Sequence, residues 1–223
     1  MDVRAVTWDA FGTLVHHGME TIAGAAADIT RDLALPVSSE VFLDRWQERY
    51  FRLLGSGEFR TIGEANALSL AQAAASYGHD VDVTPYVERM ESQWFLLDPY
   101  PETARALEGL RDLPMAIVSN ADEDVLHAVL RRGNISVGPV ISSERARAYK
   151  PDPRIFAEAL RELGVPASEV LHVGDSFEAD VRGASMAGMK TAWVNRRGVA
   201  RKGGEGPDIE IERLDELLAV LGR

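Results

Sequence analysis

The sequence predicts an α/β fold: a doubly wound parallel sheet with a set of helices inserted after its first strand. Three features of the 223-residue chain point to it: short apolar runs rich in β-branched residues, helical patterns between those runs, and one long region without a strand pattern. Apolar runs without alternation are typical of strands covered on both faces, as in parallel sheets. Strands that alternate with helices indicate a doubly wound sheet, in which ligands bind beyond the carboxyl ends of the strands.

Five segments have the composition of buried strands: Val3–Trp8, Met115–Ser119, Val140–Ser142, Val170–Gly174 and Thr191–Val194. The clearest helix between them begins in the segment KPDP. Asp152 is placed there as an N-cap, Pro153 as the first helical residue and Gly164 as the C-terminal exit. Residues 121–134 form a second helical pattern, which starts with acidic residues and ends with basic ones, as the helix dipole favours.

Residues 16–97 contain no convincing strand and are expected to be helical. Four helical patterns lie in this region: Met19–Leu35, Ser39–Leu54, a segment opening on Thr61 and Glu64 in capping-box spacing, and a segment opening on Thr84 as cap and Pro85 in the first turn. Short polar joints between them suit an antiparallel bundle. We therefore expect residues 1–15 and 98–223 to form the α/β core and residues 16–97 to form a four-helix cap over the strand ends.

The composition narrows the range of partners. The 24 basic and 35 acidic residues give a net charge of −11, which disfavours nucleic acid and anionic membranes as partners. The chain has no cysteine, no apolar stretch of bilayer length and no basic-then-apolar start, so a cytoplasmic protein is expected. Residues 195–208, NRRGVARKGGEGPD, predict a mobile surface loop. Oligomeric state and substrate identity do not follow from the sequence.

Polar residues with catalytic potential occur at the ends of the predicted strands. In chain order they are Asp9 and Thr13, Ser119 and Asn120, Lys150, and Asp175 and Asp180. Each alone has an ordinary interpretation, such as a turn or a helix cap. Their order and their common position beyond strand ends favour a single site instead. Two acids could hold Mg²⁺, which prefers oxygen ligands, and a lysine and a serine could bind phosphoryl oxygens.

These residues and the motifs around them, DAFGTL, KPDPRIF and GDSFEADVRGASMAGMKTAWVNR, resemble the haloacid dehalogenase superfamily. The resemblance covers nearly the whole chain and includes a helical cap where the family's first cap class (C1) has one. It implies a Rossmann-like core and, since most members are phosphatases, phosphoryl transfer through an aspartyl-phosphate with Mg²⁺ as cofactor and a small phosphorylated molecule as substrate.

The resemblance also implies roles for individual residues. It assigns catalysis to Asp9, Ser119 and Lys150, substrate binding to Thr13 and Asn120, metal binding to Asp9, Asp175 and the backbone carbonyl of Phe11, and a supporting role to Asp180. In this scheme Asp9 is the nucleophile. Asp180 either fixes a metal-bound water or orients Lys150.

Phe11 departs from the phosphatase pattern. Most phosphatases of the superfamily carry a second aspartate there, which protonates the leaving alcohol and contributes roughly 10²–10⁴ in rate. A backbone carbonyl at this position can still bind metal, because every residue has one. An aromatic residue in this place is similar to the 2-haloacid dehalogenases, in which the aspartate attacks carbon and displaces halide without metal. Metal-independent cleavage of a carbon–halogen bond by Asp9 is therefore the alternative.

Other positions favour the phosphatase interpretation. Gly174 and Asp175 stand where these dehalogenases have serine and asparagine, and Phe156 stands where they have tyrosine. An additional carboxylate at position 175 would repel an anionic haloacid but would help to bind Mg²⁺. A third interpretation is a binding or regulatory protein that keeps the fold and has lost catalysis, with Phe11 as its support.

The cap region leaves its own questions open. The dehalogenases use a cap arginine for the halide, and its position aligns with Gln47, although Arg45 and Arg49 are close. His16 and His17 follow the first turn and are expected to be solvent-facing linker residues. Either could supply the proton that Phe11 cannot.

Overall fold

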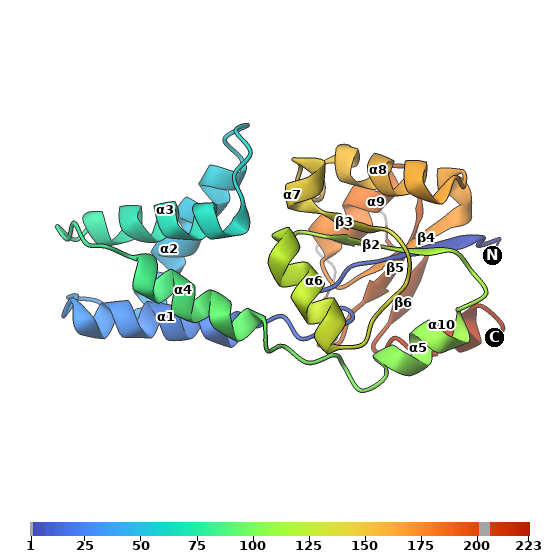
Figure 1. Ribbon diagram of the computed structural model, residues 1–223, viewed down its shortest axis with the longest axis horizontal. Helices are drawn as coiled ribbons and strands as arrows, with labels where there is room; N and C mark the ends of the chain where they lie inside the picture. Colours follow the sequence, from blue (N-terminus) through green and yellow to red (C-terminus); the bar gives the residue numbers. More distant parts are fainter. Residues whose placement is uncertain (1, 201–205) are drawn as a thin grey trace. The chain divides into compact units, whose positions relative to one another are not determined.

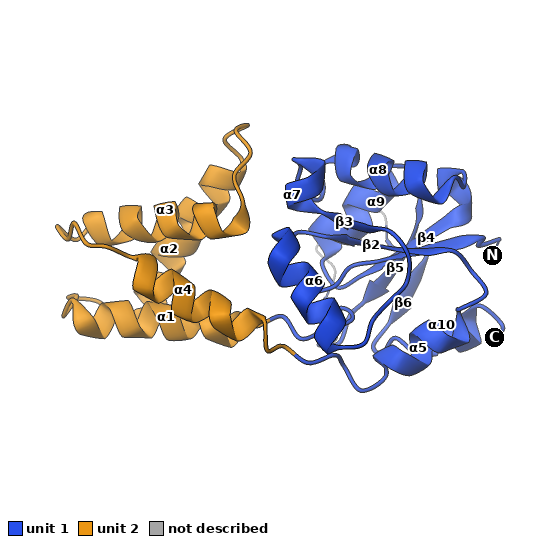
Figure 2. Ribbon diagram, viewed as in Figure 1, with its two compact units in different colours: residues 1–17, 98–223 blue, residues 18–97 orange. Residues whose placement is uncertain are grey.

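The computed structural model describes residues 2–200 and 206–223. The chain divides into two compact units, one made of residues 1–17 and 98–223 and the other of residues 18–97 (Figure 2). The first unit contains the sheet and the second contains only helices (Figure 1).

The first unit is built on a six-stranded parallel sheet with the order β3-β2-β1-β4-β5-β6. Its strands are β1 (Ala5–Trp8), β2 (Met115–Ser119), β3 (Val140–Ser142), β4 (Val170–Gly174), β5 (Lys190–Val194) and β6 (Ile209–Ile211). Strands β1, β2 and β4 are buried along their whole length, as the uninterrupted apolar runs predicted. The predicted α/β fold with a helical insertion between β1 and β2 is therefore confirmed.

Helices cover both faces of the sheet, with α7, α8 and α9 on one side and α5, α6 and α10 on the other (Figure 1). They are α5 (Thr103–Gly109), α6 (Glu123–Arg132), α7 (Ser143–Ala146), α8 (Pro153–Leu163), α9 (Gly183–Met186) and α10 (Glu216–Val220). A 3₁₀ turn (Ala167–Glu169) precedes β4, and a π-helical segment (Phe177–Arg182) follows it. Helix α8 has the predicted ends: the Asp152 side chain accepts a hydrogen bond from the Arg154 N–H, and Gly164 closes the helix at φ 64°.

The second unit consists of α1 (Met19–Asp32), α2 (Ser39–Leu54), α3 (Ile62–Ala75) and α4 (Thr84–Trp94). Its core is formed by apolar side chains from all four helices, among them Ile29, Phe42, Trp46, Leu70 and Met90. The capping box of Thr61 and Glu64 is present with both of its hydrogen bonds. No helix in the described parts of the chain combines the length and apolar character that crossing a membrane requires.

Three local predictions need correction or comment. Thr84 does not cap α4: it is the first helical residue, and its N–H is held by the Asp82 carboxylate, a stronger acceptor than a hydroxyl. Strand β6 was not predicted, because its sequence Ile-Glu-Ile alternates and lacks the uninterrupted apolar run that marked the other strands. The loop predicted over 195–208 has no helix or strand at 195–200 or 206–208, and residues 201–205 lie outside the described residues. Its first residue, Asn195, is buried rather than surface-exposed.

Candidate active site

The predicted site residues meet where three adjacent strands end. Strand β1 lies between β2 and β4, and Trp8 is in register with Ile117 on one side and Val173 on the other. Asp9 continues this ladder, since its N–H donates to the Val173 carbonyl at 2.9 Å. Because parallel strands end at a common edge, the side chains that follow them project into the same space. Asp9, Ser119 and Asp175 come together in this way.

Asp9 is buried, with 5% of its surface exposed, and its carboxylate accepts three hydrogen bonds. Its Oδ1 accepts from Ser119 Oγ at 3.0 Å and from Lys150 Nζ at 2.6 Å, while its Oδ2 accepts from Thr13 Oγ1 at 3.2 Å. Burial raises the pKa of Asp9 and the ammonium of Lys150 opposes that rise. The carboxylate is thus oriented by its neighbours, as a nucleophile requires.

The turn after Asp9 depends on a glycine. Gly12 has φ 88°, a conformation that side-chain-bearing residues rarely adopt, and its N–H donates to the Val15 carbonyl at 2.7 Å. A Cβ at position 12 would lie 2.4 Å from Asp175 Oδ2, so the turn packs directly against that carboxylate. Phe11 precedes Gly12 in this turn and is half-buried.

Lys150 is fully buried and shared by two acids. Its Nζ donates to Asp9 Oδ1 and to Asp180 Oδ1, each at 2.6 Å. Burial alone would lower the pKa of Lys150, but the two carboxylates outweigh it and hold the pKa above its usual range. Asn120 fixes the lysine backbone, accepting from the Lys150 N–H at 2.7 Å and donating to its carbonyl at 3.2 Å. The structure thus places the Asn120 amide against Lys150.

Asp180 is aimed at Lys150 by the π-helical segment after β4. The Val181 N–H donates to the carbonyl of Ser176, five residues back, at 3.3 Å, which is the π-type bond. The Ser176 N–H also binds Asp180 Oδ2 at 2.9 Å. Gly174 makes room, because a Cβ there would lie 2.2 Å from Asp180 Cγ. Although burial acts in the other direction, Lys150 and a neighbouring histidine hold the pKa of Asp180 below its ordinary value.

Asp175 differs from the other two acids. Desolvation, followed by the negative charges of Asp9 and Asp180, raises the pKa of Asp175 to about 8. The imidazole Nε2 of His17 lies 3.9 Å from its Oδ2, and Trp193 Nε1 donates to its backbone carbonyl at 2.8 Å. His17 is exposed, as the sequence predicted, and its ring also lies beside Asp175.

Carboxylate oxygens of Asp9, Asp175 and Asp180 all lie within 4.8 Å of one another. Hard oxygen donors at this spacing suit Mg²⁺. Desolvation is the largest cause of the raised pKa of Asp175, and the negative charges of Asp9 and Asp180 add to it. These three carboxylates could therefore hold a divalent cation.

The contacts described for the other predicted residues lie within their own unit. The His16 ring packs at 4.2 Å from that of Tyr100. Arg45, Gln47 and Arg49 belong to α2 of the helical unit, where the Arg45 guanidinium lies 5.3 Å from the centre of the Tyr77 ring. Arg49 donates to the Arg45 carbonyl at 2.9 Å.

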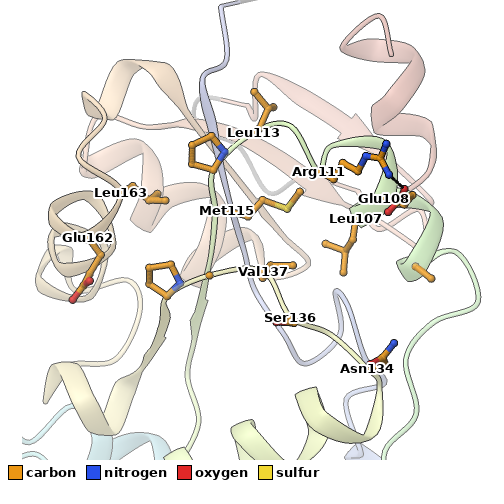
Figure 3. A pocket seen from close by; sticks show the side chains of 14 residues that line it. Leu107, Glu108, Arg111, Leu113, Met115, Asn134, Ser136, Val137, Glu162 and Leu163 are labelled. Atoms are coloured by element: carbon orange, nitrogen blue, oxygen red, sulfur yellow. Dashed lines mark hydrogen bonds and ion pairs between the residues drawn. The ribbon is translucent and has the colours of Figure 1, made fainter.

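A cavity of about 680 Å³ opens at the other end of β2, near Met115 (Figure 3). It is lined by side chains of α5, the segments before β2 and β3, and the end of α8, among them Leu107, Arg111, Leu113, Val137 and Leu163. No predicted site residue contributes to its wall. This cavity is therefore separate from the acidic cluster.

A model of the haloacid dehalogenase-like hydrolases matches residues 3–188, most of the chain. The protein belongs to this hydrolase family. One relative from Methanopyrus kandleri, named glyceraldehyde 3-phosphate phosphatase, is 34% identical over 182 residues, which are 78% of this chain and 71% of that protein. An (S)-2-haloacid dehalogenase from Xanthobacter autotrophicus is 30% identical over 201 residues, 87% of this chain and 76% of that protein.

Most of the named relatives are 2-haloacid dehalogenases. Among solved structures, the L-2-haloacid dehalogenase of Xanthobacter autotrophicus superposes with a TM-score of 0.77 at 25% identity, covering 99% of this chain and 98% of that one. Membership in the family therefore leaves two reactions in view, and the residues of this chain must separate them.

Sequence reasoning missed one supporting residue of this hydrolase. His172 lies in the segment Val170–Gly174, which was predicted as a buried strand, and 1% of its surface is exposed. Its Nε2 lies 3.1 Å from Asp180 Oδ1 and its Nδ1 lies 2.8 Å from Thr7 Oγ1. The Phe156 ring packs edge-on against it, with centroids 5.2 Å apart. A polar residue inside an otherwise apolar strand was the available signal, because buried polar groups need partners.

Proposed function

We propose that this protein is a metal-dependent phosphatase that acts on a small phosphorylated molecule, with Asp9 as nucleophile. The observation that carries the proposal is the position of Asp175, whose carboxylate lies against the turn of Asp9 within an acidic cluster. A phosphate monoester is a dianion, so such a cluster would repel it unless a cation were bound. With a divalent cation, the same carboxylate becomes a ligand.

The residues of this chain have distinct tasks in the proposed reaction. Bound Mg²⁺ would neutralise charge on the phosphoryl oxygens and lower the repulsion between substrate and nucleophile. Lys150, held by its two acids, contributes a fixed positive charge beside Asp9. The Ser119 hydroxyl, 3.0 Å from Asp9 Oδ1, can donate to a phosphoryl oxygen when substrate is bound.

Two displacements complete the turnover. An oxygen of Asp9 attacks phosphorus in line, the bond from phosphorus to the leaving oxygen breaks, and an aspartyl-phosphate forms. Water then attacks the phosphorus of this intermediate, releasing phosphate and regenerating the Asp9 carboxylate. Thr13 and Lys150 keep that carboxylate in one orientation throughout.

Phe11 limits the first displacement. Its side chain has no proton to give, so an alkoxide must leave without help from this position. We therefore infer a preference for good leaving groups, as in aryl and acyl phosphates. The expected preference over alkyl phosphates is about 10²–10⁴ in rate, the usual contribution of a general acid.

A 2-haloacid dehalogenase is the second candidate, favoured by Phe11 and by the names of most relatives. In that reaction Asp9 would attack the carbon that bears the halogen, halide would leave with the bonding pair, and water would hydrolyse the ester. Asp175 weighs against it, because a reaction without metal gives this third acid no role, and above a pKa of about 8 its ionised form would repel a carboxylate substrate. The single group that separates the candidates is thus the acid at position 175.

The test measures phosphate release from 4-nitrophenyl phosphate, acetyl phosphate and glycerol phosphate with Mg²⁺ and with EDTA, and halide release from 2-chloropropionate. Phosphate release that requires Mg²⁺ and disappears in Asp9→Asn is the expected result. Asp152→Asn is the matched control, because asparagine also caps a helix and the contacts given for the Asp152 side chain are with the backbone and guanidinium of Arg154.

Two other outcomes would overturn the proposal. Halide release in EDTA without phosphate turnover would establish the dehalogenase. Absence of both activities in a folded protein would indicate a binding or regulatory role.

A further inference from the structure

Arg196, which follows β5 and Asn195, contacts the turn that begins at Asp9, here called the nucleophile turn. The side chain of Arg196 is 19% exposed and lies against residues that are distant in sequence. Its Nη2 donates to the Thr13 carbonyl at 2.9 Å, and its Nε approaches the Gly12 carbonyl at 3.4 Å, which is a longer and weaker contact. One guanidinium thus spans two consecutive carbonyls of the turn that begins at Asp9.

Two further groups hold the guanidinium in place. Its Nη1 donates to Glu102 Oε1 at 2.5 Å, and its plane lies over the Tyr100 ring at 3.6 Å from the ring centre. Glu102 is 4% exposed, and although burial favours its neutral form, the bond from Arg196 keeps the pKa of Glu102 below its ordinary value. The arginine is therefore ionically paired and stacked, which restricts it to one geometry.

The two carbonyls belong to residues that touch the reacting groups. Thr13 donates its hydroxyl to Asp9 Oδ2 at 3.2 Å. Gly12 packs so closely against Asp175 that no Cβ fits between them. Movement of this turn would therefore shift both the nucleophile and the second acid. Phe11, whose carbonyl is the expected third ligand, precedes Gly12 in the same turn.

We propose that Arg196 is a positioning residue that fixes the nucleophile turn in the geometry that binds the metal ion. The change in Mg²⁺ affinity predicted below rests on the proposed function. The change in hydrogen exchange predicted below does not rest on it, since the contacts from Arg196 to the turn involve only residues of this chain.

The experiment compares Arg196→Lys with the wild-type protein. Lysine keeps the positive charge but lacks the planar fork that reaches two carbonyls and a carboxylate at once. Mg²⁺ affinity, measured by calorimetric titration, is expected to weaken about 10- to 100-fold, as for other residues that orient metal ligands. Amide hydrogen exchange at Gly12 and Val15 should become faster in the metal-free protein, because their N–H groups close this turn.

Arg145→Lys is the matched control. Arg145 is also a partly buried arginine that bridges acids and a carbonyl: it donates to Glu158, Glu162 and the Val140 backbone, away from the nucleophile turn. A purely structural effect of losing such an arginine should appear in both variants as lower thermal stability. Only Arg196→Lys should change Mg²⁺ affinity and exchange at the turn.

The outcomes separate this proposal from the proposed function. If wild-type protein binds no Mg²⁺, the metal-dependent function fails, and exchange at Gly12 and Val15 alone decides the role of Arg196. Unchanged exchange and unchanged Mg²⁺ affinity in Arg196→Lys would overturn the proposal. If that variant does not fold, Glu102→Gln, which removes the charge paired with the guanidinium, must show the same effects at smaller size or the proposal fails.

Discussion

The two sides of the acidic cluster differ in how their charge is balanced. On one side, Asp9 and Asp180 share the buried ammonium of Lys150 at 2.6 Å each. On the other side, the ion pair described for Asp175 is a 3.9 Å approach of the His17 imidazole, and the pKa of Asp175 is raised to about 8. Lys150 thus balances charge on one side of the cluster, whereas Asp175 on the other side has no ammonium at hydrogen-bond distance among the described contacts. Either a bound cation or a proton would balance the charge of Asp175. The cation corresponds to the proposed phosphatase and the proton to the metal-independent dehalogenase.

The largest effect on stability is expected from removing the ammonium of Lys150, which pairs with Asp9 and Asp180. Lys150→Met would leave Asp9 and Asp180 buried beside each other without their cation, which we expect to cost about 3–5 kcal/mol of unfolding free energy and to abolish turnover. Urea unfolding at pH 7 measures the loss. Lys190→Met is the control, because Lys190 binds only backbone carbonyls of Asp2 and Ser168 in its recorded contacts. Equal losses in the two variants would contradict the assigned importance of the buried pair.

Replacing Asp175, on the other side of the cluster, is expected to have a smaller effect on stability, of opposite sign. The folded-state pKa of Asp175 lies above its ordinary value of 3.8, so the metal-free folded state binds more protons than the unfolded state. Stability in EDTA should therefore fall as pH rises from about 4 to about 8. Asp175→Asn should remove this fall and be more stable than wild type at pH 8 by on the order of 2 kcal/mol.

Thermal unfolding from pH 5 to pH 8, with EDTA and with Mg²⁺, measures that difference. In Mg²⁺ the order should reverse, because only the wild-type protein keeps the ligand and gains stability by binding. An Asp175→Asn protein that is stabilised by Mg²⁺ as strongly as wild type would place the ion elsewhere.

The smallest expected effect concerns the support of the paired side. His172→Leu removes a partner from Asp180 and another from Thr7, and we expect a loss of about 1–3 kcal/mol. Asp180 keeps Lys150, so the variant should remain folded and retain its metal site. His127→Leu, at an exposed position of α6, is the control and should change stability by less than about 0.5 kcal/mol. Identical unfolding curves for His172→Leu and wild type would show that the imidazole does not support the acid.

The sequence was informative where a physical rule acts locally. Uninterrupted apolar runs identified β1, β2 and β4, and Asp152 and Gly164 marked the ends of α8, because these signals depend on neighbouring residues alone. Strand-end position brought Asp9, Ser119 and Asp175 together before any coordinates, since parallel strands share one edge.

The features that the sequence did not predict depend on contacts between segments that are distant along the chain. Arg196 lies in a stretch whose composition predicts a mobile loop, and its role arises from a turn more than 180 residues earlier. The relation of His172 to Asp180 likewise requires the π-helical segment, which has no sequence pattern of its own. Neither periodicity nor capping rules describe such interactions.

The close packing of Gly12 on Asp175 has a consequence for how the site keeps its dimensions. The separation between the nucleophile turn and this acid is set by main-chain atoms in van der Waals contact with a carboxylate, not by the rotamer of a flexible residue. A spacing fixed in this way is insensitive to most substitutions in the surroundings and intolerant of a single added methyl group at one position. Gly12 thus sets the distance between the turn that begins at Asp9 and the carboxylate of Asp175.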